Sequence, residues 1–91
     1  MLRIEIWPEA QTFLLTLSGK HKRQLSARIF SLAEHPDEAR SKLLEGFAPL
    51  RRLRAGDYRI IYFVDGPVLK VLLIDRRNDD WVYRRLKQIF G

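Results

Sequence analysis

Four arginines lie close together in the stretch LRRLRAGDYRIIYFV, residues 50–64, where Asp57 is the only acidic residue before the final valine. Side chains alternate between the two faces of a strand, so Arg52 and Arg54 share one face and Arg59 joins them if the strands form a hairpin. Arg51 lies on the opposite face. Because a guanidinium group binds phosphate through two parallel hydrogen bonds, this pattern favours a partner that carries phosphates.

These arginines also have a plainer interpretation. Charged side chains keep an exposed strand soluble and prevent it from pairing with other chains. The near absence of acidic partners between residues 50 and 64 counts against this interpretation. The residues alone leave both interpretations open.

A second group of charged residues, Asp75-Arg76-Arg77, follows a strand-like run over residues 68–74. Its distance from the turn at Gly56 depends on the register of the strands, which a sequence does not fix. If the group lies near that turn, a phosphate-sized ligand would meet several guanidinium groups at once.

Tyr83, on the predicted C-terminal helix, is the other residue that could take part in chemistry. It follows Val82 and therefore lies about 100° away from the centre of the apolar stripe. Its hydroxyl is expected to face solvent or the edge of the sheet. The plainer interpretation is a ring that packs at the rim of the core, because tyrosines are commonly half-buried.

Basic residues are concentrated in the second half of the chain. The 91 residues carry a net charge of +6. Residues 1–50 hold seven basic and six acidic side chains, whereas residues 51–91 hold ten and five. Twelve of the 17 basic residues are arginines. RNA or DNA is therefore the leading partner, with an acidic protein or an anionic membrane surface as alternatives.

Length and composition predict one globular domain over residues 1–91. There are no cysteines, which excludes disulfides and thiolate metal sites and agrees with a cytoplasmic location. Nowhere do about 18 apolar residues run together, so neither a secreted nor a membrane-spanning protein is expected. His21 and His35 do not share the spacing of a metal pair, and no metal or cofactor is expected.

The first half of the chain predicts a strand and two helices. Alternating Leu2, Ile4 and Ile6 indicate the strand. One helix is expected from Pro8 to Ser18-Gly19, and a second from there to Pro36. Residues 36–49 are expected to form a loop with three apolar anchors buried in the core, which are Leu43, Leu44 and Phe47.

The second half predicts three strands and a helix. The strands are expected at about 50–54, 58–64 and 68–74, and the helix from about Asp79. Its buried stripe is expected to consist of Val82, Leu86, Ile89 and Phe90. Short turns force these strands to pair antiparallel, and the apolar residues on both faces of 58–64 indicate a central strand. The predicted fold is α+β, with an N-terminal helical hairpin and a C-terminal helix covering one face of an antiparallel sheet of about four strands.

The segment LRRLRAGDYRIIYFVDGPVLKVLLIDRRNDDWVYRRL, residues 50–86, resembles the second half of the RelE/ParE superfamily of bacterial and archaeal toxins. The shared features are a basic strand, a Tyr-Arg-apolar-apolar-Tyr strand, a hairpin, an arginine-containing segment and a closing Asp-x-Val-Tyr. The first half fits as well, as a strand, a helical hairpin and a Lys-Leu-x-x-Gly loop at residues 42–46. The resemblance covers essentially the whole chain.

In the RelE branch, this resemblance implies the toxin of a type II toxin–antitoxin system that enters the ribosomal A site and cuts messenger RNA without a metal. The ribose 2′-hydroxyl attacks the adjacent phosphate and leaves a cyclic phosphate and a 5′-hydroxyl. Matching the motifs places the strand arginine of the family on Arg59, its later arginine on Arg77 and its C-terminal tyrosine on Tyr83. The arginines would stabilise the phosphorane, and Tyr83 would transfer a proton or stack on a base.

The chain departs from the family at two strand positions. Well-studied members carry lysines at the positions that match Leu50 and Arg52. Arginine does not release its proton at neutral pH, so Arg52 is expected to stabilise transition-state charge rather than to shuttle protons. Arg51, Arg54 and Arg76 are the further RNA-binding candidates.

Two other functions stay open. One is a ParE-like toxin that inhibits DNA gyrase. The other is a basic binding module with a degenerate site, and the absence of the two lysines is consistent with it. The combination of Arg59, Arg77 and Tyr83 favours RelE. Either toxin class implies a cognate antitoxin whose acidic or amphipathic segment folds over the basic surface, and the RelE branch adds the ribosome and messenger RNA as partners.

Overall fold

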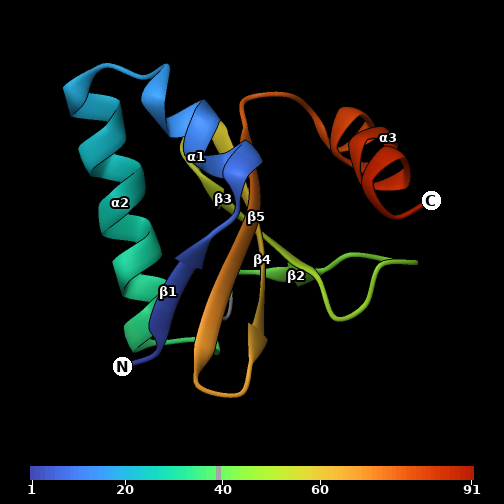
Figure 1. Ribbon diagram of the computed structural model, residues 1–91, viewed down its shortest axis with the longest axis horizontal. Helices are drawn as coiled ribbons and strands as arrows, with labels where there is room; N and C mark the ends of the chain where they lie inside the picture. Colours follow the sequence, from blue (N-terminus) through green and yellow to red (C-terminus); the bar gives the residue numbers. More distant parts are fainter. Residues whose placement is uncertain (39) are drawn as a thin grey trace.

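The computed structural model describes residues 1–38 and 40–91. The elements described follow the order β1 (Arg3–Ile6), α1 (Pro8–Leu15), α2 (Gly19–Glu34), β2 (Lys42–Leu43), β3 (Arg51–Ala55), β4 (Tyr58–Asp65), β5 (Val68–Asp75) and α3 (Asp79–Phe90). The strands form one sheet in the order β1-β5-β4-β3-β2 (Figure 1). The α+β class, the three helices and the longer strands agree with the sequence prediction, and β4 is the central strand.

Local chemistry accounts for the boundaries of these elements. The turns of the β3–β4–β5 meander contain Gly56 and Gly66 with φ of 61° and 56°. Residues with a Cβ atom rarely adopt this backbone conformation. Helix α3 begins after Asn78, whose side chain accepts a hydrogen bond from the backbone N–H of Trp81 at 3.0 Å. This cap, three residues after the end of β5 in the chain, therefore fixes the start of α3.

The sheet differs from the prediction in two respects. It is a mixed sheet of five strands, because β1 pairs in parallel with β5, where Ile4 lies opposite Leu69. Strand β1 is not joined to β5 by a short turn, so the rule that makes consecutive strands antiparallel does not apply to it. The fifth strand is β2, which lies in the predicted loop over 36–49 and pairs with β3 at only two positions.

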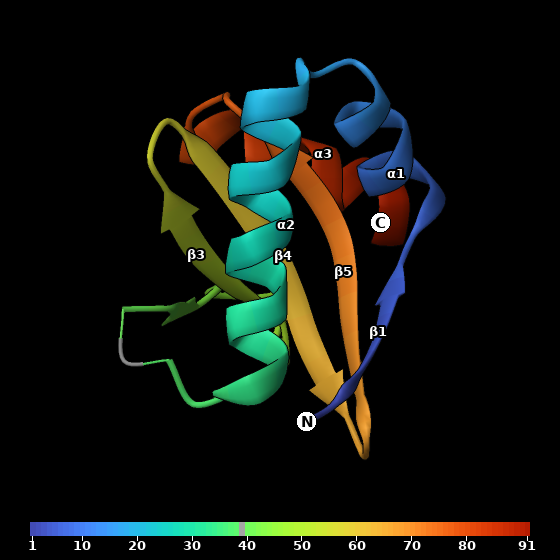
Figure 2. The same ribbon diagram turned by 90° about the vertical axis from the view of Figure 1, so that its left-hand side faces the viewer.

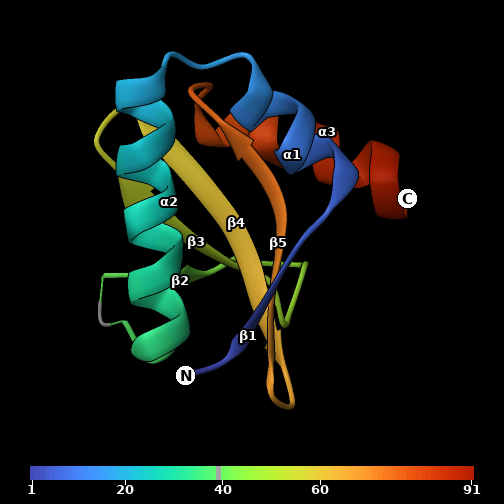
Figure 3. The same cartoon turned by 60° about the vertical axis from the view of Figure 1, so that its left-hand side comes forward.

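The helices cover both faces of the sheet, whereas the sequence analysis placed them on one. Helices α1 and α2 pack on one face together with Ile60 and Tyr62, and α3 packs on the other with Ile61 and Leu73. Figures 2 and 3 show α2 and α3 on opposite sides of the strands. Since the middle strands are apolar on both faces, each face needs a cover.

Three residues expected in the core are exposed. Leu43 is 55% exposed on the edge strand β2, while Ile89 and Phe90 are 38% and 52% exposed. Helix α3 is held through Val82 and Leu86, and its C-terminal end projects beyond the sheet in Figure 1. No helix among residues 1–38 and 40–91 is long and apolar enough to span a membrane.

Candidate active site

Three of the four arginines of the β3–β4 hairpin lie on the face that α3 covers. Arg54 lies directly opposite Arg59, and Arg52 lies opposite Ile61, which belongs to the core under α3. The predicted sharing of one face by Arg52, Arg54 and Arg59 is thus seen in the strand register. Arg51 lies on the other face, as expected, and donates hydrogen bonds to the hydroxyl and carbonyl oxygens of Ser41.

Two of these arginines converge on one carboxylate. Arg52 Nη1 lies 2.5 Å from Asp79 Oδ2, and Arg59 Nε lies 2.8 Å from Asp79 Oδ1. The arginine side chains are only 12% and 14% exposed. Asp79 is the first residue of α3, so the contact joins the start of that helix to two neighbouring strands.

The surroundings of Asp79 act on its ionisation in opposite directions. Burial disfavours the carboxylate and raises its pKa, but the hydrogen bonds from Arg52 and Arg59 outweigh burial and lower the pKa below its ordinary value. Asp79 is therefore an anion at neutral pH, and one negative charge is shared between two guanidinium groups.

Arg77 lies beside this pair. Arg59 is opposite Asp75 in the β4–β5 register, which places the segment after β5 near the Gly56 turn and answers the question left open by the sequence. The backbone carbonyl of Arg77 accepts a hydrogen bond from Arg59 Nη1 at 2.9 Å. The Arg77 side chain is 65% exposed and lies over the ring of Trp81, 5.0 Å from its centroid. We call Arg52, Arg59 and Arg77 the arginine cluster.

Tyr83 lies one helical turn after Asp79. Residues four apart project from the same side of a helix, so Tyr83 stands next to the residue that holds the arginines. Its ring packs against Phe47 at 5.8 Å between centroids, and its hydroxyl oxygen accepts a hydrogen bond from the backbone N–H of Glu45 at 3.2 Å. The side chain is half-buried, and its own hydroxyl proton remains available to another acceptor.

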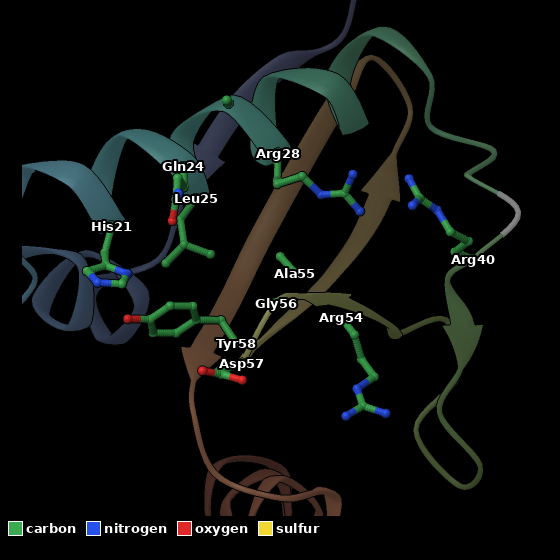
Figure 4. Close-up of a pocket in the computed structure, with 11 residues that line it drawn as sticks. His21, Gln24, Leu25, Arg28, Arg40, Arg54, Ala55, Gly56, Asp57 and Tyr58 are labelled. Carbon is green, nitrogen blue, oxygen red and sulfur yellow. The ribbon is translucent and has the colours of Figure 1, made fainter.

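The remaining RNA-binding candidates lie outside the cluster. Arg54 is exposed and lines a pocket of about 660 Å³ between α2 and the β3–β4 turn. In Figure 4, Arg28 and Arg40 point toward each other across this pocket. Arg76 lies over the ring of Tyr58 and donates to its hydroxyl at 3.1 Å.

Asp79 is the site residue that the sequence analysis missed. Its position at the start of a helix gives a carboxylate an ordinary role, because the helix dipole favours acidic side chains there. Asp79 lies four residues before Tyr83, so the sequence could have placed the two on one side of the helix. Its contact with Arg52 and Arg59 could not be predicted without the strand register. Within residues 1–38 and 40–91, no group of three or more His, Cys, Asp or Glu side chains is arranged to hold a metal ion.

Comparison with known proteins identifies the family of the chain. A family profile described as the ParE toxin of type II toxin–antitoxin systems matches residues 5–81. The chain belongs to this toxin family, within the RelE/ParE superfamily. A search of curated protein sequences gives no significant match.

The toxin fold is also that of solved RelE structures. The RelE–RelB complex of Pyrococcus horikoshii contains a chain with 29% sequence identity and a TM-score of 0.73, and the match covers 86% of this toxin and 97% of that chain. The intact Escherichia coli RelBE complex gives 21% identity and a TM-score of 0.73, covering 86% and 99%. The RelBE2 complex of Mycobacterium tuberculosis gives 22% and 0.73, covering 84% and 98%. The similarity to the E. coli and M. tuberculosis structures shows that they share the fold of this chain.

Proposed function

We propose that this toxin is a ribosome-dependent endoribonuclease that cuts messenger RNA in the A site and so inhibits translation. The observation that carries the proposal is the meeting of two arginines at the start of α3, with two further candidate residues close to it in the chain. Arg52 and Arg59 meet at Asp79, Arg77 is bonded to Arg59 through its carbonyl, and Tyr83 follows one turn later. These are the side chains for which the RelE resemblance implies a catalytic role.

The proposed reaction needs no group beyond the RNA and the protein. The 2′-oxygen forms a bond to the adjacent phosphorus, the bond from phosphorus to the 5′-oxygen breaks, and the products are a 2′,3′-cyclic phosphate and a 5′-hydroxyl. The 2′-hydroxyl loses a proton, and the 5′-oxygen gains one. Guanidinium groups stabilise the negative charge that grows on the phosphorane oxygens. Tyr83 is our candidate for proton transfer, because its oxygen accepts the Glu45 N–H while its own proton is available.

We also propose a cognate antitoxin as the physiological partner. The solved neighbours include complexes of RelE with RelB. The basic second half of this chain and its exposed Arg54, Arg76 and Arg77 suit an acidic or amphipathic segment. The targets proposed here lie in the cytoplasm, where we expect the toxin to act.

A second candidate function is inhibition of DNA gyrase. The match of residues 5–81 to the ParE profile favours it. In this case the arginine surface would serve for docking. If neither activity appeared, the degenerate binding module would be the remaining interpretation.

One experiment separates these functions. Purified toxin is added to a reconstituted translation reaction with a defined message, and the 5′ ends of the RNA are mapped by primer extension with and without ribosomes. A gyrase supercoiling assay is run on the same preparation. Cuts at A-site codons only in the presence of ribosomes support the endoribonuclease, whereas intact message with inhibited supercoiling supports the gyrase inhibitor.

A further inference from the structure

We propose that the Asp79 carboxylate occupies the binding position of an RNA phosphate, and that Asp79 swings out of this position when the substrate binds. The inference deepens the proposed function and rests on it. It assigns to Asp79 the role of a competitor for the arginines.

The geometry of the contact is that of an oxyanion site. Two guanidinium groups from neighbouring strands each donate to a different oxygen of one carboxylate, at 2.5 and 2.8 Å. A phosphodiester also presents two charged oxygens and a single negative charge. Arg52 and Arg59 can therefore exchange one anion for the other without moving far.

The arginines keep a donor that the carboxylate does not use. Arg52 Nε is buried, and no hydrogen-bond acceptor faces it among the residues that the structure describes. An unpaired buried donor costs free energy, which a ligand with an additional acceptor recovers. An RNA phosphodiester carries two ester oxygens besides its two charged ones, so it offers an acceptor for Arg52 Nε that the carboxylate lacks.

Asp79 itself is placed so that it can leave. Its side chain is 44% exposed, while both arginines are largely buried, so a rotation about its side-chain bonds moves the carboxylate into solvent. The start of α3 stays capped by Asn78, and the dipole of this twelve-residue helix favours a negative charge near its first turn. The exposed Arg77 stands beside it.

The neighbouring Asp80 provides a matched control. It lies in the same first turn of α3, is exposed, and makes no ion pair within the described part of the chain. Asp79→Asn and Asp80→Asn change the net charge equally, so general attraction to a polyanion rises equally in both. Only Asp79→Asn removes the competitor.

The test measures binding without cleavage. A fluorescent single-stranded RNA of twelve nucleotides, 2′-O-methylated throughout so that it lacks the nucleophile, is titrated into the full-length wild type and both variants. If the open state makes up about a tenth of the free toxin, Asp79→Asn binds roughly tenfold more tightly than wild type. Asp80→Asn stays within about twofold of wild type. Equal or weaker binding by Asp79→Asn relative to Asp80→Asn overturns the proposal and makes Asp79 a positioning residue for the arginines.

A second measurement uses the wild type and so does not depend on the folding of a variant. The Nε–H resonances of Arg52 and Arg59 are followed by NMR during the same titration. Both are expected to shift, because Arg52 Nε gains an acceptor and Arg59 Nε exchanges Asp79 for the phosphate. Arg85, whose Nε is paired with Glu9 at 2.6 Å, serves as the reference. Unchanged Arg59 signals at saturation contradict the proposal. If Asp79→Asn binds RNA more tightly but the toxin leaves ribosomal messages intact, the nuclease proposal is contradicted and the phosphate-binding site is supported.

Discussion

Arg59 in β4 donates its Nε–H to Asp79, the first residue of α3, over 2.8 Å. The contact joins the central strand of the sheet to the helix that carries Tyr83. Arg52 reaches the same carboxylate from the next strand. The arginines and the tyrosine thus come from three elements, and their relative positions depend on how α3 is attached to the sheet.

The arginine cluster is expected to carry the charge stabilisation. Arg59→Ala or Arg77→Ala should lower the rate of message cleavage by about 10²-fold or more, because each removes a donor to the phosphorane. The rate is measured in reconstituted translation from the appearance of new 5′ ends. Arg84→Ala is the control, since Arg84 is an exposed arginine of α3 outside the cluster. Equal losses in all three variants would show that only overall charge matters.

Tyr83→Phe separates the hydroxyl from the ring. Phenylalanine keeps the packing against Phe47 and removes only the group that accepts from Glu45 and carries the exchangeable proton. Single-turnover cleavage is expected to slow by about 10²-fold or more, with little change in RNA binding. A variant that cleaves as fast as wild type excludes proton transfer by Tyr83.

Asp79 is expected to make stability depend on pH. Its pKa is lowered in the folded state, so it contributes stability above the unfolded value of about 3.9, and this contribution is lost as the pH falls through the folded pKa. Thermal unfolding of wild type and Asp79→Asn should differ at pH 7 and converge as the pH is lowered from about 4 to 2. A difference that stays constant over that range would contradict a charged Asp79 in the folded protein.

Tyr62 provides a test of the core that is independent of the site. Its ring is fully buried, and its hydroxyl has no hydrogen-bond partner among the residues that the structure describes. Tyr62→Phe should therefore raise the free energy of unfolding by about 1 kcal/mol, because it removes an unsatisfied polar group. Urea denaturation measures the change. A loss of stability would mean that the hydroxyl is hydrogen-bonded in solution.

The attachment of α3 is expected to depend on the middle of the helix. Leu86 is fully buried, so Leu86→Ala should cost about 2–5 kcal/mol in unfolding free energy. Ile89→Ala, one turn later at a residue that is 38% exposed, should cost much less. Urea denaturation compares the two. Similar losses would show that the last turn of α3 is buried in solution.

The order of elements was readable in the sequence because periodicity, turn glycines and helix caps are local signals. The placement of α3 was not, because it depends on which apolar residues face each side of the sheet after pairing. Ile61 and Leu73 form the floor for α3, whereas their neighbours Ile60 and Ile74 face α2. Leu43 is exposed because it lies on the edge strand β2. A strand of two residues is too short to show a periodic pattern in the sequence.

The candidate site divides in the same way. The shared face of Arg52, Arg54 and Arg59 followed from the alternation of strand residues. The functional assignments of Arg77 and Tyr83 came from the family resemblance, and their catalytic roles stay predictions. The role of Asp79 required the three-dimensional arrangement, because its two partners are 27 and 20 residues away in the chain.

The central claim is that this site cleaves RNA through the 2′-hydroxyl. It is tested most directly in a reconstituted translation reaction by comparing an all-ribose message with one that carries a single 2′-deoxynucleotide immediately 5′ of the mapped cut. Our account predicts a cut with a 5′-hydroxyl end in the first message, no cut at that position in the second, and a strongly slowed cut of the first message by Arg59→Ala. Cleavage of both messages at equal rates, or intact messages alongside inhibited gyrase, would contradict it.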